Sequence, residues 1–95
     1  MSKKVSEKSI ETRLRDEVKA LGGIALKFIP ISFTGLPDRI VLLPGGRIYF
    51  VELKAPGRLP TERQKAVHTI LEKLGFSVWV VDGHNMLKTF MDEVA

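Results

Sequence analysis

Apolar residues near the start of the chain recur every three or four positions, and this spacing predicts a helix over residues 6–21. Two glycines at 22–23 follow the last apolar position and end the helix. A short apolar segment over 24–29 then predicts a strand that Pro30 closes. Because glycine and flanking prolines disfavour regular structure, we expect 31–37 to be an irregular loop. The helical stripe consists of Ile10, Leu14, Val18 and Leu21.

The middle of the chain holds two strand-like runs, 38–43 and 47–54, which Pro44-Gly45-Gly46 separates. A three-residue connection that contains glycine is typical of a hairpin, so we expect these strands to pair antiparallel. If Leu43 and Arg47 face each other, the numbers of paired residues sum to 90, and Asp38 lies opposite Glu52. A two-residue turn would shift the register by one and place the two acids on opposite faces.

The last third of the chain predicts a second helix, a buried strand and a third helix. A capping box from Thr61 to Gln64 begins a helix that Gly75 ends. The most apolar run of the chain, 76–81, reads as a buried strand, and 85–94 has helical spacing. The resulting order, α-β-β-β-α-β-α, predicts an α/β fold with a mixed sheet in one domain over 1–95.

Composition and length limit which partners and which kinds of site the protein can have. Lys and Arg total 15 against 11 acidic residues, and this net charge of +4 favours a polyanionic partner without naming one. The alternative is ordinary surface charge that keeps the protein soluble. The lack of cysteine excludes disulfides, thiolate metal sites and a cysteine nucleophile. No apolar run is long enough to cross a membrane, so we expect a soluble cytoplasmic protein. Since a chain of 95 residues builds only a small core, we also expect a homodimer.

The hairpin brings candidate catalytic groups together. Alternation along the second strand places Lys54 on the same face as Glu52, so two carboxylates and one ammonium gather at one end of the hairpin. Two carboxylates provide a small number of oxygen ligands, and such a site suits Mg²⁺ or Mn²⁺ because these ions retain several water ligands. The alternative is a surface ion pair between Lys54 and one acid. Burial of charges within the apolar strand 50–54 favours the metal site, because such burial is costly without a function.

Several segments of the chain form one recognisable pattern. They are Gly35-Leu36-Pro37-Asp38-Arg39, the hairpin turn at 44–46, Phe50-Val51-Glu52-Leu53-Lys54-Ala55-Pro56-Gly57 and Gln64. This pattern resembles the VRR-NUC family of the PD-(D/E)xK nuclease superfamily. Shorter matches at 10–11, 22–23, 26–28 and 74–76 extend the resemblance over nearly the whole chain, whereas 31–34 departs from the family pattern. The resemblance implies a restriction-endonuclease-like domain with an α-β-β-β-α-β core and a C-terminal helix.

The same resemblance implies roles for individual residues. Asp38 and Glu52 would be metal ligands, the carbonyl of Leu53 would complete the inner shell, and Lys54 would orient or activate the attacking water. Gln64 would join the site from the second helix, although its position also fits a purely structural role in the capping box.

An acid from the first helix would also join the site and the metal shell. Glu11 fits better than Glu7, but the two lie four residues apart on one helical face, so both alternatives stay open. His68 and His84 lie outside the motif and receive no role. Cations near the site loops are candidates for phosphate contacts, namely Lys27, Arg39, Arg58, Arg63 and Lys65.

The expected activity is therefore metal-dependent hydrolysis of phosphodiester bonds in DNA. Stand-alone members of the family resemble structure-selective endonucleases that act on four-way (Holliday) junctions as homodimers, which makes branched DNA the leading substrate. The alternatives are cleavage of flaps or plain duplex, a non-catalytic DNA-binding or assembly module with the same fold, and a phosphodiesterase for small nucleotides.

Overall fold

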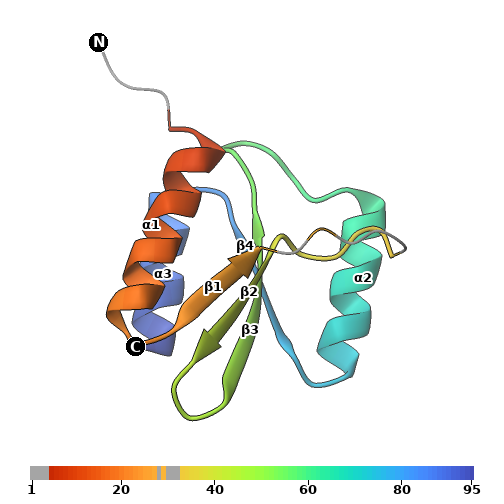
Figure 1. The fold of residues 1–95 in the computed structure, drawn as a ribbon. Coiled ribbons are helices and arrows are strands. Elements are labelled where there is room, and N and C mark those ends of the chain that lie inside the picture. The colour runs from red at the N-terminus through yellow and green to blue at the C-terminus, as the bar shows by residue number, and fades with distance from the viewer. Residues whose placement is uncertain (1–4, 28, 30–32) are drawn as a thin grey trace.

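A computed structural model describes residues 5–27, 29 and 33–95 of the chain. The elements follow the predicted order (Figure 1): α1 (Glu7–Ala20), β1 (Ile24–Lys27), β2 (Arg39–Leu43), β3 (Arg47–Leu53), α2 (Glu62–Lys73), β4 (Ser77–Val81) and α3 (His84–Val94). The α-β-β-β-α-β-α prediction is thus confirmed, with bounds that differ by a residue or two. Parts of the predicted first strand and of the loop after it, at Phe28 and at 30–32, lie outside the described residues.

The strands form one mixed sheet in the order β1-β2-β3-β4. The pairs β1–β2 and β2–β3 are antiparallel, whereas β3 and β4 run parallel on either side of the crossover through α2. In the hairpin, Leu43 pairs with Arg47 and Arg39 pairs with Val51, so the predicted three-residue turn and its register are confirmed. Gly45 and Gly46 both adopt positive φ, at 87° and 73°, which explains why this turn needs two glycines.

The core lies between the sheet and the helices α1 and α3, which cover the same face (Figure 1). Phe90 of α3 is fully buried and meets Tyr49 and Trp79 edge to face, with ring centroids 5.8 and 5.2 Å apart. Complete burial of one such side chain stabilises the fold by about 1.5–3 kcal/mol. Buried residues from the other elements complete this core, namely Ile10, Leu14, Val18, Ala25, Val41, Leu43, Val51, Leu53, Val81, Leu87, Met91 and Val94.

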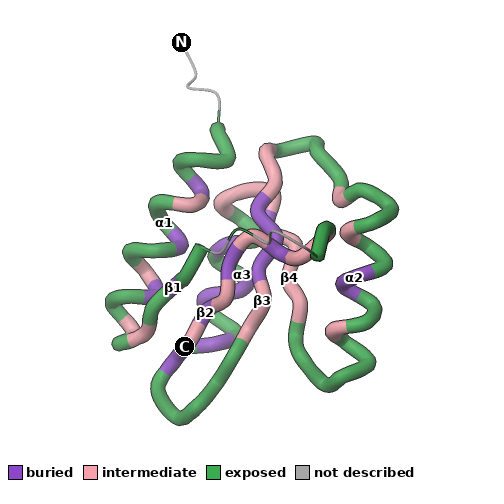
Figure 2. The backbone as a smooth tube through the Cα atoms, turned by 45° about the vertical axis from the view of Figure 1, so that its right-hand side comes forward, coloured by how far each residue is buried: buried purple, intermediate pink, exposed green. Residues whose placement is uncertain are grey.

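Helix α2 lies on the opposite face and packs mainly against β4. In Figure 2, α2 is exposed over most of its length, whereas the sheet and the inner sides of α1 and α3 hold the buried positions. The β1 end of this face therefore stays open, and Ile24, Leu26 and Ile48 are 52, 42 and 42% exposed there. We refer to these three residues as the open sheet face. Within the described residues, no helix is both long and apolar enough to cross a bilayer.

Candidate active site

The candidate site lies where the hairpin strands meet α2. Asp38 immediately precedes β2, and its Oδ2 accepts a hydrogen bond of 2.8 Å from the backbone N–H of Leu53 in β3. Lys54 immediately follows β3, and its backbone N–H donates to the carbonyl of Val81 in β4 at 3.0 Å. Both residues are therefore fixed by the sheet although they lie just beyond the strands.

Glu52 is the centre of the cluster, and only 1% of its side chain is exposed. Its Oε2 accepts a hydrogen bond of 3.4 Å from Nε2 of Gln64 and lies 3.9 Å from Nζ of Lys54. Its Oε1 lies 3.5 Å from Nε2 of His68, and neither atom has a hydrogen-bond partner among the described residues. A buried carboxyl oxygen without a hydrogen-bond partner is costly, so Oε1 is a candidate ligand for a cation.

The surroundings of Glu52 favour its protonated form. Burial is the main cause that raises its pKa to about 8, and the hydrogen bond with Asp38 and the negative charge of Asp38 act in the same direction. The ammonium of Lys54 lowers the pKa but does not offset these effects, and the charge of Glu7 raises it further. Near neutral pH the site therefore holds a proton that a bound cation would displace.

Gln64 lies in the capping box of α2 and also contacts Glu52, so its position is compatible with both of the roles that the sequence suggested as alternatives. Its Oε1 accepts the N–H of Thr61 at 2.8 Å, while the Thr61 hydroxyl accepts the N–H of Gln64 at 3.1 Å, so the predicted capping box is confirmed. The other end of the same amide contacts Glu52. The cap thus fixes the side-chain rotamer that carries Nε2 to the site.

His68 is the residue that the sequence reasoning left without a role. It is 7% exposed and lies one helical turn after Gln64, which brings both side chains to Glu52. Burial lowers the pKa of His68, and this effect exceeds the opposing influence of Glu72. The spacing of four from Gln64 is the signal that could have found it. His84 lies elsewhere, where its Nδ1 is 3.0 Å from NH1 of Arg13.

Glu11 and Arg39 form an ion pair with each other on the α1 side of the sheet. Arg39 NH2 lies 2.5 Å from Glu11 Oε1, and NH1 donates to the carbonyl of Ala25 at 3.2 Å. Arg39 is 5% exposed, a placement that does not suit its predicted phosphate contact. Glu11 is thus paired with Arg39 and not with the Glu52 cluster, whereas the charge of Glu7 raises the pKa of Glu52, so both acids remain candidates for the first-helix position of the site.

Of the other predicted DNA contacts, Arg63 holds the loop before Asp38. Its Nε donates to the carbonyl and the hydroxyl of Thr34 at 3.2 Å, and its guanidinium carbon lies 5.3 Å from the centre of the Phe33 ring. Lys65 forms a surface ion pair with Glu62, and Arg58 is exposed on the loop before α2. Lys27 is exposed at the end of β1.

Gly35 packs the loop before Asp38 tightly against α2. Its φ is +86°, and an added Cβ would lie 2.9 Å from side-chain carbons of both Arg63 and Val67. We expect Gly35→Ala to lower the free energy of unfolding by about 1–3 kcal/mol and to slow cleavage, because the loop must move away from α2. Urea unfolding and a cleavage assay measure the two effects.

Gly45→Ala is the matched control for that substitution. Gly45 has a φ of +87°, but nothing lies within 4 Å of an added Cβ. The control therefore carries the same backbone strain without the clash. Equal losses of stability and activity in the two variants would contradict a packing role for Gly35.

The donor atoms at the site suit a hard divalent cation. No three histidine, aspartate or glutamate side chains gather closely enough to hold a metal ion anywhere in residues 5–27, 29 and 33–95. Asp38 and Glu52 therefore offer two carboxylates, and further ligands have to come from a backbone carbonyl or water. A site with few protein ligands and several waters is characteristic of Mg²⁺. The unpartnered Oε1 of Glu52 supports this fit.

Comparisons with known proteins agree with this geometry. No family model matches the sequence. The chain is 48% identical over 82 residues to "Putative nuclease p44" of Acyrthosiphon pisum secondary endosymbiont phage 1, a match that covers 86% of this chain and 88% of that protein. A solved structure described as "VRR_NUC domain" superposes with a TM-score of 0.87 at 29% identity, over 94% of this chain and 97% of that one. The chain therefore belongs to the VRR-NUC family of nucleases.

Proposed function

We propose that this nuclease is a metal-dependent endonuclease that hydrolyses phosphodiester bonds in DNA, with branched DNA as its substrate and a homodimer as its working form. The observation that carries the proposal is the buried carboxylate of Glu52, which meets Asp38, Lys54 and Gln64 at one end of the sheet. A DNA-binding module without activity would need only surface cations, and it would gain nothing from a buried acid that destabilises the fold.

In this mechanism Asp38 and Glu52 would hold Mg²⁺ or Mn²⁺, with the carbonyl of Leu53 as a further ligand. The cation would polarise the scissile phosphate and lower the pKa of a water molecule. Gln64 keeps the Glu52 carboxylate in place through the hydrogen bond to Oε2. Lys54, which is 19% exposed, holds a positive charge between the buried acid and solvent. There it orients the attacking water and stabilises the negative charge that develops on the phosphate.

Branched DNA and the homodimer form the second part of the proposal. Two copies related by a twofold axis would present two equivalent sites, as paired cuts across a four-way junction require. The open sheet face offers an apolar surface for such contact, since Ile24, Leu26 and Ile48 are each more than 40% exposed. The net charge of +4 supports binding to a polyanion.

Replacement of Lys54 by alanine tests the chemistry and the substrate together. We expect wild type to cut a labelled four-way junction faster than flap, duplex or single-stranded DNA, in Mg²⁺ or Mn²⁺ but not in EDTA. Lys54→Ala should lower this rate by about 100-fold or more, because the charge beside the scissile phosphate is lost. Lys73→Ala, an exposed lysine on α2, is the control and should retain the activity.

The same assay separates the alternatives. Tight junction binding without cleavage by wild type would indicate the non-catalytic module, and faster cutting of flap or duplex would replace the junction as the substrate. Cleavage of a small nucleotide diester that long DNA does not inhibit would indicate a phosphodiesterase for small substrates. Sedimentation at the assay concentration tests the homodimer, which an active monomer would contradict.

A further inference from the structure

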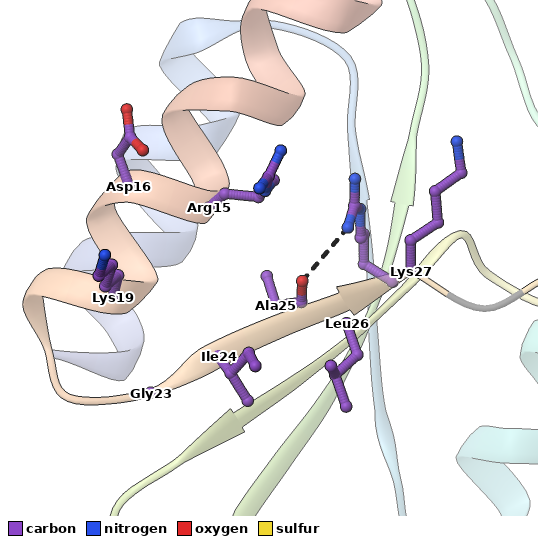
Figure 3. Close-up of a pocket in the computed structure, with 9 residues that line it drawn as sticks. Arg15, Asp16, Lys19, Gly23, Ile24, Ala25, Leu26 and Lys27 are labelled. Carbon is purple, nitrogen blue, oxygen red and sulfur yellow. Dashed lines mark hydrogen bonds between the residues drawn. The ribbon is translucent and has the colours of Figure 1, made fainter.

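A cationic surface lies at the β1 edge of the sheet, between α1 and β1. A hollow of about 540 Å³ opens there, and Figure 3 shows Arg15 reaching into it from α1 while Lys27 extends from the end of β1. We refer to it as the α1–β1 groove. It is lined by Arg15, Asp16, Lys19, Gly23, Ile24, Ala25, Leu26, Lys27 and Arg39.

The charges of the groove are predominantly positive and free. Arg15, Lys19 and Lys27 are all exposed, and none of them forms an ion pair with any residue that the structure describes. Glu11 already balances the fourth cation, Arg39. Asp16 is the one acid in the lining. Unpaired cations around a hollow at a sheet edge attract the negative charges of an extended polyanion.

The position of the groove relative to the active site decides which DNA segment it can hold. Lys27 pairs with Arg39, the residue after Asp38, so the groove begins at the end of the sheet that carries the site. From there it follows β1 for about 13 Å back to Gly23, a length that matches the rise of about four nucleotides. Asp38 instead contacts Glu52, which accepts a hydrogen bond from Gln64 of α2 on the opposite face of the sheet. The groove is therefore separated from the proposed cleavage site by the β1 edge.

We propose that the α1–β1 groove binds the phosphate backbone of a DNA arm that leaves the active site around the β1 edge. The groove therefore contacts uncut DNA and adds affinity for substrates with an arm long enough to reach it. The ligand is the phosphate backbone, because the unpaired groups of the groove are the cations Arg15, Lys19 and Lys27, and contacts from such cations to phosphates do not depend on the base sequence. This inference rests on the proposed function only in that DNA is the ligand.

Neutralisation of Arg15 and Lys27 tests the groove. In Arg15→Gln/Lys27→Gln we expect the dissociation constant for a four-way junction to rise about 10-fold in the presence of Ca²⁺. The slope of log affinity against log salt should fall by about 1.8, since each lost phosphate contact contributes about 0.9. Asp16→Asn should instead tighten binding a few-fold. In Mg²⁺ the double substitution should raise KM with little effect on kcat, because the groove lies outside the cleavage site.

Lys73→Gln/Lys88→Gln is the control with the same change in net charge, because both lysines are exposed on other helices. Equal weakening by the two double variants would overturn the groove and leave only a general charge effect.

Junctions with arms shortened to a few base pairs provide a second test. Such arms do not reach the groove, so the groove variant should bind them as wild type does. Normal cleavage by wild type together with unchanged binding by the groove variant would refute the groove alone. Loss of binding by the variant, with no cleavage by wild type, would support the groove and refute the proposed activity.

Discussion

Glu52→Gln is expected to lower the rate of DNA cleavage about 1,000-fold and to leave the affinity for DNA nearly unchanged. The two side chains have the same shape, so the contact with Gln64 can persist while the negative charge that would hold the cation is lost. Since Glu52 is 1% exposed, DNA does not contact it directly. Single-turnover cleavage of a junction in Mg²⁺, beside a binding titration in Ca²⁺, measures the two effects separately.

Glu62→Gln is the matched control for this substitution. Glu62 is 92% exposed at the start of α2 and forms a surface ion pair with Lys65, so it loses the same charge without any contact to the site. We expect it to cleave at the wild-type rate. A Glu52→Gln enzyme with comparable turnover would overturn the assignment of Glu52. Equal inactivation of both variants would instead show that the loss is not specific to the site.

The hairpin could be predicted from the sequence because every step of that prediction is local. The turn at 44–46 fixes the register, and the register fixes which residues face each other across β2 and β3. The hydrogen bond from Leu53 to Asp38 and the contact between Asp38 and Glu52 both follow from this pairing. The capping box at Thr61 is equally local and was found for the same reason.

The contacts that could not be predicted join elements far apart in the chain. The pair between Arg39 and Glu11 spans 28 residues and depends on how α1 lies over the sheet. Its cation looked like a surface residue, although alternation with Val41 and Leu43 places Arg39 on the core face of β2. His68 shares a helical face with Gln64 through its spacing of four, but this spacing does not show that the face contacts Glu52 of β3. Only the packed fold reveals that this face carries Gln64 and His68 to the same carboxylate.

The open sheet face and the α1–β1 groove could not be predicted from the sequence for a related reason. The pattern of β1 marks Ile24 and Leu26 as core candidates, but α2 packs mainly on β4 and does not extend across the sheet to cover them. The exposure of an apolar strand residue is decided by the element above it, which alternation along the strand does not specify. The two surfaces meet at this edge strand and share Ile24 and Leu26.

The stability of the metal-free protein should fall as the pH rises, and Glu52→Gln should remove this dependence. The pKa of Glu52 is about 8 in the folded state and 4.5 ordinarily, so between these values the folded protein holds a proton that the unfolded chain has lost. The free energy of unfolding therefore decreases by up to about 1.4 kcal/mol per pH unit and levels off above pH 8. Thermal melts in EDTA from pH 7 to 9 measure this slope for both proteins.

This pH range also separates Glu52 from His68. The pKa of His68 is lowered from 6.5, so His68 reduces the stability of the fold only as the pH falls through that value. Above pH 7 its side chain is neutral in both the folded and the unfolded protein.

At pH 9 we expect Glu52→Gln to melt several degrees above wild type, since about 1 kcal/mol shifts the melting temperature of a domain this small by 4–8 °C. Mg²⁺ should then stabilise wild type and leave the variant unchanged, because only wild type keeps the carboxylate that the cation would bind. Parallel pH profiles of the two proteins in EDTA would contradict the raised pKa, whereas equal stabilisation by Mg²⁺ would place the cation elsewhere. The melts in EDTA measure how much the burial of the Glu52 carboxylate destabilises the fold, and the melts in Mg²⁺ measure how much a bound cation offsets this destabilisation.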